Sequence, residues 1–466
     1  MTPTTRLRSL LIATLAGLAL PTAAAAAAEP PTAHTSYVAG EVIVRYERSA
    51  DRAARAAVQR ATGVSDPRVF APRTRALTIR DGQSVAETLR ELRAQPEVAT
   101  AAPNPVARAS AFFPSDPGNA GVAGGWQQLQ WNFLAEAGVN APDAWQRLID
   151  VGRPGGAGVT VAVLDTGVAY SNRGRCPRSA NSSSRRTVTC RRSPDFHNGD
   201  FVAGYDFVDD DTRPNDENGH GTHVAGTIGE GTGDNVGVTG LAYGARIMPV
   251  RVLDRLGEGD SVAISSGIRF AARKGADVIN LSFEFGTAVT RAEIPDILAA
   301  LRYARRKGTL VVGASGNAAA RSIAYPARAA QVLSVGATTQ HGCVAEYSNN
   351  GANLDLVAPG GGEDADIADD LNCRPKERPG GNIFQMTFDG SVRRFGLPGG
   401  YMGTSMAAPH ATAAAALVIA SGVLGPNPTP AAVEARLKAT ARDLGSGGPD
   451  FRYGAGLLDA ARAVTP

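Results

Sequence analysis

Three segments of this chain carry residues that could perform nucleophilic catalysis. Ser405 follows a Gly-Thr pair and precedes an alanine-rich apolar run, a pattern that predicts a tight turn and then a helix with the serine at its start. His220 stands between two glycines where another helical pattern begins, and Asp165 directly follows a valine-rich stretch at 158–164. A serine hydroxyl attacks a carbonyl only when a base takes its proton, and the usual base is a histidine oriented by a carboxylate. The three residues are therefore candidates for a catalytic triad.

The elements around these residues predict a parallel α/β sheet. Strand patterns occur at 158–164, 246–252, 278–281, 310–313 and 332–335. Helical patterns alternate with them at 140–148, from 220, at 261–274, at 292–307, from 405, at 430–440 and at 457–464. Such alternation is typical of a parallel sheet with helices on both faces. Ligand sites of these sheets lie beyond the carboxyl ends of the strands, where Asp165 could meet His220 and Ser405.

The N-terminal quarter has a different pattern. Residues 1–28 combine early arginines, an apolar run and alanines with A-x-A spacing, which predicts a cleaved signal peptide. Strand and helix patterns then follow at 41–46, 51–61, 75–80, 84–94 and 97–102. They predict a small α+β unit of the split-βαβ, ferredoxin-like kind. The stretch 104–125 contains Pro, Gly, Ser and Asp without periodicity, which predicts a linker.

Composition narrows the class of protein. The chain has 466 residues, of which 43% are hydrophobic and 20% are charged, and its formal net charge is +3. That length supports one large or two unequal globular domains. The small net charge gives no basic field for nucleic acid, and no segment after the signal sequence has about 18 uninterrupted apolar residues. We therefore expect a soluble, monomeric mature protein that binds neither nucleic acid nor membrane.

The four cysteines indicate an oxidising compartment. Cys176, Cys190, Cys343 and Cys373 can pair in three ways. We favour Cys176 with Cys190 and Cys343 with Cys373 because each pair closes a local loop, which stabilises by about 3 to 4 kcal/mol on loop-entropy grounds. Zinc is the alternative, and it is disfavoured because no C-x-x-C pair occurs. With the signal sequence, the cysteines predict an extracellular or periplasmic protein.

The chain resembles the subtilisin-like serine proteases, or subtilases (peptidase S8), in four stretches that occur in the family's order. These are VAVLDTG at 161–167, HGTHVAG at 220–226, SGN at 315–317 and GTSMAAP at 403–409. The order aspartate, histidine, serine is that of subtilisin and differs from the orders in chymotrypsin and the α/β-hydrolases. The likeness covers about residues 115–463, and residues 41–107 resemble the family's inhibitory propeptide more weakly.

The resemblance implies a subtilisin-like three-layer α/β fold with a central, mostly parallel sheet, preceded by a small α+β propeptide domain. It implies that Asp165, His220 and Ser405 form the triad. Asn317 would donate its side-chain amide to the oxyanion together with the Ser405 backbone N–H. The expected divisions are a signal peptide at 1–28, a propeptide at 29–110 with its core at 41–107, and a peptidase domain at 111–466.

Two other chemistries use the same residue types. Asp-Thr-Gly is also the signature of aspartic proteases, but those need two carboxylates that share a proton, and this chain has one such triplet. His220 and His223 could bind a metal, but Gly221 stands where the glutamate of H-E-x-x-H would be. We therefore expect His223 to have a structural role.

By the resemblance, two segments form the walls of the substrate pocket. Their substrate-binding residues would be Ser282, Phe283 and Glu284 on one side and Ala314, Ser315 and Gly316 on the other. A peptide could add to such an edge through main-chain hydrogen bonds, which predicts broad specificity. Phe283-Glu284-Phe285 departs from the family's Leu-Gly-Gly-like stretch. Glu284 could favour a basic substrate side chain or face water, and we favour the solvated alternative.

The triad needs no cofactor, but a structural calcium ion could bind at 232–238. This segment resembles the family's calcium loop, where side-chain and carbonyl oxygens are ligands. The candidate ligands are Asp234, Asn235, Val236 and Val238. The loop carries one extra residue, and Gly174 stands near the place where the family has a ligating aspartate. The acidic run at 363–370 could also bind calcium, although we favour a solvated loop there.

These features predict a secreted serine endopeptidase that hydrolyses peptide bonds of proteins through an acyl-enzyme. It would be made as a self-processing precursor whose own propeptide inhibits it. The alternatives are a catalytically inactive, peptide-binding subtilase homologue and a narrow-specificity processing protease. The intact set of Asp165, His220, Asn317 and Ser405 opposes the first, and the second rests only on the altered edge at 283–285. The sequence assigns no role to the insertions at 171–198 and 360–400.

Overall fold

The computed structural model describes residues 37–80, 83–105, 111–177, 187–377 and 381–466. The signal peptide predicted at 1–28 lies outside these residues. Contacts divide the chain into two compact units, with the boundary between Ala109 and Ser110. In the described part of the chain, no helix combines the length and the apolar character that a membrane crossing requires.

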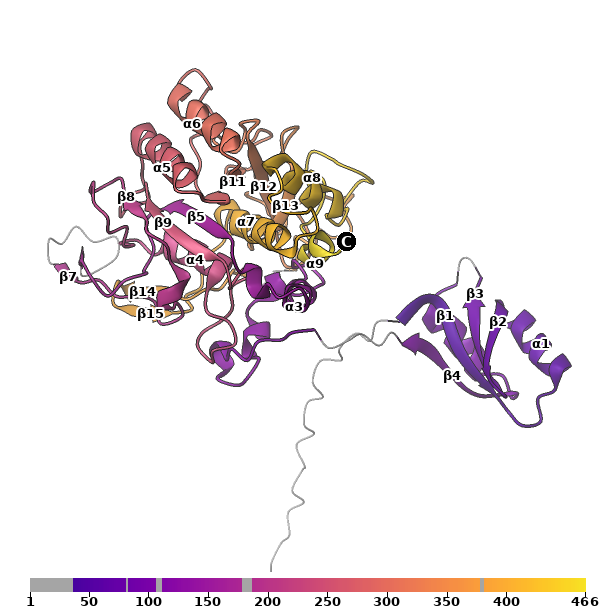
Figure 1. The fold of residues 1–466 in the computed structure, drawn as a ribbon. Coiled ribbons are helices and arrows are strands. Elements are labelled where there is room, and N and C mark those ends of the chain that lie inside the picture. The colour runs from indigo at the N-terminus through magenta and orange to yellow at the C-terminus, as the bar shows by residue number, and fades with distance from the viewer. Residues whose placement is uncertain (1–36, 81–82, 106–110, 178–186, 378–380) are drawn as a thin grey trace, which may run out of the picture. The chain divides into compact units, whose positions relative to one another are not determined.

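The N-terminal unit is a four-stranded antiparallel sheet with two helices (Figure 1). Its elements are β1 (Tyr37–Tyr46), α1 (Arg52–Ala61), β2 (Val64–Ala71), β3 (Thr74–Ile79), α2 (Val85–Arg93) and β4 (Val98–Pro105). Asp51 and Ser84 cap the two helices by accepting backbone N–H groups of the first turns. The strand order β2-β3-β1-β4 and the βαββαβ succession confirm the predicted ferredoxin-like arrangement.

The larger unit is built on a seven-stranded parallel sheet with the order β13-β12-β11-β10-β5-β9-β8. Its strands are β5 (Thr160–Asp165), β8 (Tyr205–Asp206), β9 (Arg246–Arg251), β10 (Val278–Leu281), β11 (Leu310–Ala314), β12 (Val332–Thr338) and β13 (Leu356–Pro359). The central strands β5, β10 and β11 are apolar along nearly their whole length because both faces of the sheet are covered. The predicted three-layer α/β architecture is therefore confirmed.

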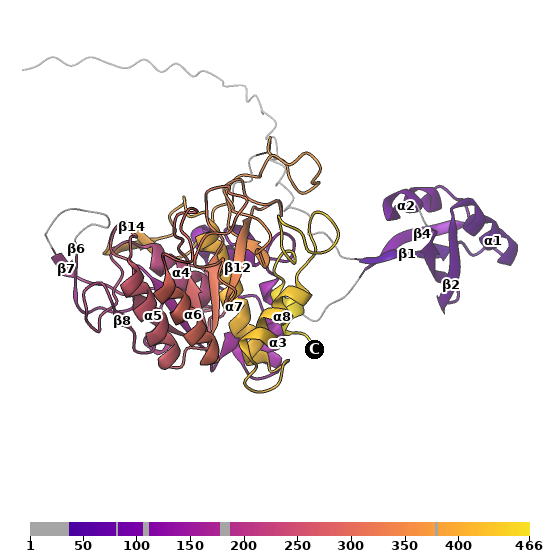
Figure 2. The same ribbon diagram turned by 90° about the horizontal axis from the view of Figure 1, so that it is seen from above.

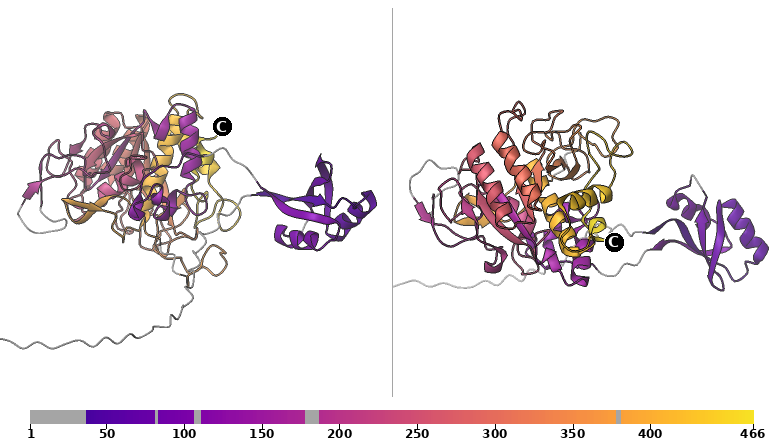
Figure 3. Two further views of the ribbon diagram at one scale, coloured as in Figure 1. Left: turned by 90° about the horizontal axis from the view of Figure 1, so that it is seen from below. Right: turned by 45° about the horizontal axis from the view of Figure 1, so that its top comes forward.

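Helices cover the two faces of this sheet (Figures 1 and 2). Helices α5 (Ser261–Arg273) and α6 (Pro295–Arg306) lie side by side on one face, as Figure 3 also shows. The other face carries α4 (His220–Gly229) and α7 (Thr404–Ser421), with α3 (Ala141–Asp150), α8 (Pro430–Thr440) and α9 (Ala460–Val464) packed beside α7. Helix α7 is buried nearly all round, which explains why its sequence is rich in alanine and lacks a polar face.

Both disulfides favoured from the sequence are present. Cys176 is bonded to Cys190 and Cys343 to Cys373. The first closes the hairpin of β6 (Arg175–Pro177) and β7 (Thr187–Thr189) inside the insertion at 171–198. A second hairpin, β14 (Thr387–Ser391) with β15 (Arg394–Gly396), forms in the insertion at 360–400.

The prediction of a linker at 104–125 is wrong for the residues from 111 onward. Residues from 111 onward pack against the larger unit, where Phe112 contacts Trp145 edge-on. Asp116 is fully buried and accepts the backbone N–H of Gly233 at 2.8 Å. The polar residues that suggested a linker are therefore used for contacts with the 232–238 loop.

The acidic run at 363–370 is also not a uniformly solvated loop. Asp364 is buried and pairs with His341 Nδ1 at 2.8 Å, and Asp370 is buried against the hydroxyl of Tyr453. The remaining acidic side chains, Glu363, Asp366 and Asp369, are exposed. Two carboxylates of the run thus hold the insertion to the body of the protein.

Candidate active site

Asp165 and His220 meet at the carboxyl end of β5. The strand ends at Asp165, whose side chain is fully buried, and His220 is the first residue of α4. His220 Nδ1 lies 2.8 Å from Asp165 Oδ1, which also accepts the Thr166 backbone N–H. Because the carboxylate holds Nδ1 as a proton donor, Nε2 is the nitrogen that can accept a proton from another group.

The surroundings of His220 favour its charged form. Burial lowers the pKa of His220, but the charge of Asp165, its hydrogen bond and the charge of Asp216 together outweigh burial. The net result is a pKa above the ordinary 6.5. The imidazole is therefore a somewhat stronger base than a free histidine.

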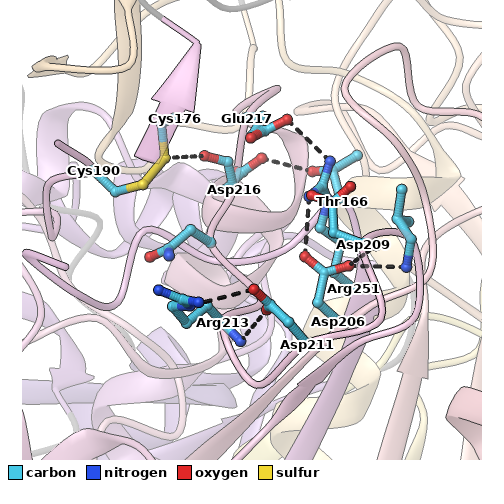
Figure 4. Close-up of polar contacts among 12 residues, drawn as sticks. Thr166, Cys176, Cys190, Asp206, Asp209, Asp211, Arg213, Asp216, Glu217 and Arg251 are labelled. Atoms are coloured by element: carbon cyan, nitrogen blue, oxygen red, sulfur yellow. Dashed lines mark hydrogen bonds and ion pairs between the residues drawn. A yellow bond between two sulfur atoms is a disulfide. The ribbon is translucent and has the colours of Figure 1, made fainter. Parts of the chain in front are cut away.

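Asp216 joins the two segments that carry this acid and base. It is buried, and its Oδ1 accepts from Thr166 Oγ1 at 2.9 Å and from the Gly219 backbone N–H at 3.0 Å (Figure 4). Its Oδ2 accepts from Thr222 through both the backbone N–H and the hydroxyl. A carboxylate at this place satisfies open amides at the start of α4. Sequence reasoning missed Asp216, and its only signal was an aspartate shortly before a helix start.

Arg251 anchors the same loop to the sheet (Figure 4). Its buried guanidinium ends β9 and bonds Asp206 Oδ2 at 3.0 Å and Glu217 Oε2 at 3.0 Å. A third carboxylate, that of Asp209, lies 2.8 Å away. Because a buried charge is costly without its partners, these contacts fix the segment that leads into His220.

Glycines with positive φ precede both candidate catalytic residues that start helices. Gly219 (φ +111°) comes directly before His220, and Gly403 (φ +147°) lies two residues before Ser405. A side chain would be strained in either conformation. These glycines let the chain turn sharply into α4 and α7, which places His220 and Ser405 in the first turns.

Ser405 is tied to the end of β10 by a reciprocal pair of hydrogen bonds. Its Oγ donates to the Ser282 carbonyl at 3.0 Å, and Ser282 Oγ donates to the Ser405 carbonyl at 2.8 Å. Asn280 Nδ2 in turn donates to Ser282 Oγ at 2.9 Å. In this structure the Ser405 hydroxyl therefore contacts the predicted substrate segment rather than His220.

Pro409 lies inside helix α7 rather than in its first turn, where a proline would cost no hydrogen bond. Helix α7 begins at Thr404, so Pro409 lies in the second turn and its missing N–H deprives the Ser405 carbonyl of a helical partner. That carbonyl accepts Ser282 Oγ instead. The proline thus frees the acceptor that ties Ser405 to β10.

Asn317 follows β11, and its side chain is held by Thr404, the residue before Ser405. Its Oδ1 accepts both the backbone N–H of Thr404 at 2.8 Å and the Thr404 hydroxyl at 3.0 Å. The amide is therefore oriented with its Nδ2 away from Thr404. Its Nδ2 lies 3.3 Å from Glu284 Oε1, which also accepts the Asn317 backbone N–H at 2.9 Å. The expectation that Glu284 faces water holds only in part, because its half-buried carboxylate also accepts hydrogen bonds from Asn317.

The hydrogen bonds place the predicted site residues in three separate groups: Asp165 with His220, Ser405 with Ser282, and Asn317 with Thr404, the residue that precedes Ser405 in the chain. The predicted pocket residues follow two neighbouring strands. Ser282, Phe283 and Glu284 come after β10, while Ala314 ends β11 and precedes Ser315 and Gly316.

His223 lies away from this chemistry. Its Nε2 donates to the Ile383 carbonyl at 2.9 Å, and its ring stacks on Tyr401 with centroids 4.0 Å apart. Burial lowers its pKa to about 3, so the ring is neutral. These contacts agree with the predicted structural role.

Buried carboxylates flank the 232–238 loop. Asp195 Oδ2 accepts the Val238 backbone N–H at 3.1 Å, and Asp234 Oδ1 accepts that of Val236 at 2.8 Å. Asp195 Oδ1 and Glu230 Oε2 are buried without a hydrogen bond in the described residues, and burial raises the pKa of both carboxyls. No group of three or more His, Cys, Asp or Glu side chains in the described ranges is arranged as a metal site.

Gly174 stands near the place where the family has a ligating aspartate, and in the structure Asp195 lies close to the 232–238 loop instead. Asp195 follows the disulfide-closed hairpin and returns to the loop, where its Oδ2 lies 2.0 Å from the position that a Cβ on Gly237 would take. Carboxylate oxygens without a hydrogen-bond partner, such as Asp195 Oδ1, are donors of the hard type that calcium prefers. The chemistry of these donors therefore suits calcium, although their side chains are not gathered as a metal site.

Comparisons with known proteins cover both units. A family model described as "Subtilase family" matches residues 156–456, and one described as "Fervidolysin N-terminal prodomain" matches residues 23–104. The chain is 32% identical over 436 residues to a thermophilic serine proteinase of Bacillus sp. (strain AK1), which covers 92% of this chain and 88% of the relative. It is 36% identical over 340 residues to Subtilisin Savinase of Lederbergia lenta, and the match covers 72% of this chain and 99% of the relative. A solved structure described as proteases from Pseudoalteromonas arctica is similar, with a TM-score of 0.56 and 30% sequence identity. The match covers 76% of this chain and 99% of the solved chain.

Proposed function

The chain belongs to the subtilase family and is a subtilisin-like serine protease with a prodomain, and from this premise we propose that Asp165, His220 and Ser405 are its catalytic triad. The observation that carries the proposal is the 2.8 Å hydrogen bond between buried Asp165 and His220 Nδ1. It leaves Nε2 as the base for a serine hydroxyl. For attack, the Ser405 hydroxyl would have to leave the Ser282 carbonyl and donate to that nitrogen instead.

The reaction would proceed through an acyl-enzyme. Ser405 Oγ attacks the scissile carbonyl while His220 takes its proton, and Asp165 stabilises the imidazolium that forms. His220 then returns the proton to the leaving amine, and water hydrolyses the acyl group by the reverse sequence.

Negative charge on the tetrahedral intermediate would be met by two donors. One is Asn317 Nδ2, whose amide is oriented by Thr404 through two hydrogen bonds. The other is the Ser405 backbone N–H, which belongs to the unpaired amides of the first turn of α7. Donors that are fixed before the charge appears stabilise the transition state without further reorganisation.

We propose that the mature protease is residues 111–466, monomeric and secreted, and that it acts on proteins and peptides as an endopeptidase of broad specificity. Residues 1–28 would direct export, which the two disulfides support. Residues 29–110 would assist folding and inhibit the site until the chain cuts itself. An inactive homologue would not need the buried Asp165–His220 pair, which favours the active enzyme.

Peptide cleavage is expected to follow the titration of His220. The base must be neutral, and its pKa lies above the ordinary 6.5, so kcat/KM should be low in acid and rise as the pH passes through a value above about 6.5. Initial rates with a chromogenic peptide between about pH 4 and 10 measure this. A profile that stays flat down to about pH 4 would contradict His220 as the base.

Calcium is expected to stabilise the fold without entering the chemistry. The ion would be held by Asp195, Asp234 and Asn235 with the carbonyls of Val236 and Val238, near Glu230. Added to chelator-treated protein at about 100 times its dissociation constant, calcium should stabilise by about 2.7 kcal/mol and raise the thermal midpoint by about 3 to 4 °C. The measurement is calorimetry on the Ser405→Ala variant, which cannot digest itself.

Asp195→Asn should remove most of this calcium response, whereas Asp369→Asn, at an exposed carboxylate, should keep it. Equal midpoints with calcium and with chelator in the Ser405→Ala protein that keeps Asp195 would show that the loop needs no ion.

A further inference from the structure

A carboxylate that lacks a cationic partner among the described residues lies beside the proposed oxyanion donor. Glu284 Oε1 accepts the Asn317 backbone N–H at 2.9 Å and lies 3.3 Å from Asn317 Nδ2. Within the described ranges, Oε2 makes no hydrogen bond, and no Lys, Arg or His pairs with this carboxylate. Glu284 is only half-buried, so it keeps its charge in contact with water while it faces the site.

The carboxylate spans the space between the two pocket segments. A Cβ built on Gly316 would lie 2.2 Å from Glu284 Oε2. Gly316 also has φ +109°, a conformation that other residues rarely adopt. The absent side chain of Gly316 thus makes room for the carboxylate that extends from the opposite segment.

Orienting Asn317 does not require Glu284. The Asn317 amide is already fixed by the backbone and hydroxyl of Thr404. The negatively charged carboxylate of Glu284 and the oxyanion of the intermediate compete for the same donor, Asn317 Nδ2. Without a cation to neutralise it, Glu284 therefore opposes the reaction. A cation that draws the carboxylate toward itself would relieve this competition.

The positions of the nucleophile and the oxyanion donor determine which substrate side chain lies nearest to Glu284. The attacked carbon must contact Ser405 Oγ and its oxygen must face Asn317 Nδ2, which lies 3.3 Å from Glu284 Oε1. The side chain attached next to that carbonyl, on the residue before the scissile bond, therefore enters the space beside Glu284. A long basic side chain can place its charge there while its aliphatic part contacts the pocket walls.

We propose that, within an otherwise broad specificity, Glu284 makes this protease prefer Lys or Arg immediately before the scissile bond. The proposal rests on the proposed function. A basic side chain pairs with Glu284 in a partly desolvated site, where a charge pair is worth more than in open water. An acidic side chain at the same position is repelled.

Peptides that differ only at this residue test the preference, with Lys, Arg, Leu or Glu before the scissile bond. The parent is expected to show a kcat/KM at least about tenfold higher for Lys and Arg than for Leu, and lowest for Glu. In Glu284→Gln the Lys-to-Leu ratio should fall about tenfold or more. Glu136→Gln, at an exposed carboxylate on the same unit, should leave the ratio unchanged. Raising the salt concentration should narrow the parent's ratio, which a purely structural Glu284 would not do.

A parent that cleaves Leu peptides as well as Lys peptides would overturn the preference even if Glu284→Gln does not fold. If folded Glu284→Gln had the same ratio of kcat/KM for Lys and Leu peptides as the parent, Glu284 would not be the cause of the preference. Failure of the proposed function gives a different result: no peptide is cut, and a serine-directed phosphonate does not label Ser405.

Discussion

Ser405→Ala is expected to abolish peptide cleavage while the protein remains folded. The substitution removes the attacking oxygen, and the expected loss of kcat is about 10⁶-fold, a size taken from subtilisin itself rather than from this chain. It also removes the hydrogen bond to the Ser282 carbonyl, but the reverse bond from Ser282 Oγ to the Ser405 carbonyl stays. Rates per folded molecule, with unfolding followed in parallel, measure this effect.

The same variant tests self-processing. Expressed identically, the parent should lose its N-terminal unit and Ser405→Ala should retain it, as read from intact mass. Ser421→Ala is a suitable control because Ser421 lies at the far end of the same helix. If Ser405→Ala also loses the unit, another protease does the maturation and self-processing is wrong. A residual rate within about tenfold of the parent would contradict the triad itself.

Asn317→Ala is expected to lower kcat by about 10²- to 10³-fold, because one oxyanion donor is lost from the transition state. KM should change little, since the donor serves the intermediate more than the bound substrate. Removing the side chain also leaves the Thr404 backbone N–H without its partner at 2.8 Å, so some loss of stability should accompany the loss of rate.

The comparison variant is Asn353→Ala, at an exposed asparagine of the same unit, which should match the parent in kcat and KM. An Asn317→Ala enzyme whose kcat equals that of the parent would exclude Asn317 as a donor. A rise in KM alone would instead indicate that Asn317 binds substrate.

The secondary-structure positions of the three proposed triad residues could be predicted because their signals are local. The apolar run before Asp165 specifies a buried strand, and the glycines before His220 and Ser405 specify sharp entries into helices. A parallel sheet brings the ends of such strands to one edge. The sequence alone therefore sufficed for the fold class and for the elements on which the proposed catalytic residues lie.

Features that depend on distant contacts could not be predicted. Nothing near Pro409 in the sequence shows that Ser282 takes over the carbonyl that the proline leaves open. Glu284 looks like a surface residue until the turn at Gly316 is placed beside it. Asp195 is separated from its expected position by a long polar insertion, and only the folded hairpin returns it to the calcium-type loop.

Short or atypical strands were also missed. β8 has two residues, and β13 has four and ends in a proline, so neither shows a periodic pattern. β2 contains an Asp-Pro pair, which normally indicates a turn. Pairing with β9, β12 and β3, respectively, forms these strands, and tertiary pairing is invisible to a local pattern.

The role of Ser405 as nucleophile is tested most directly by the mass of the folded protein after reaction with a serine-directed phosphonate, followed by peptide mapping. We expect one adduct per chain, located on Ser405, whose rate of formation rises with pH at the same midpoint as peptide cleavage. The adduct should be lost in His220→Ala. A folded parent that forms no adduct, or an adduct on any other serine, would contradict Ser405 as the nucleophile.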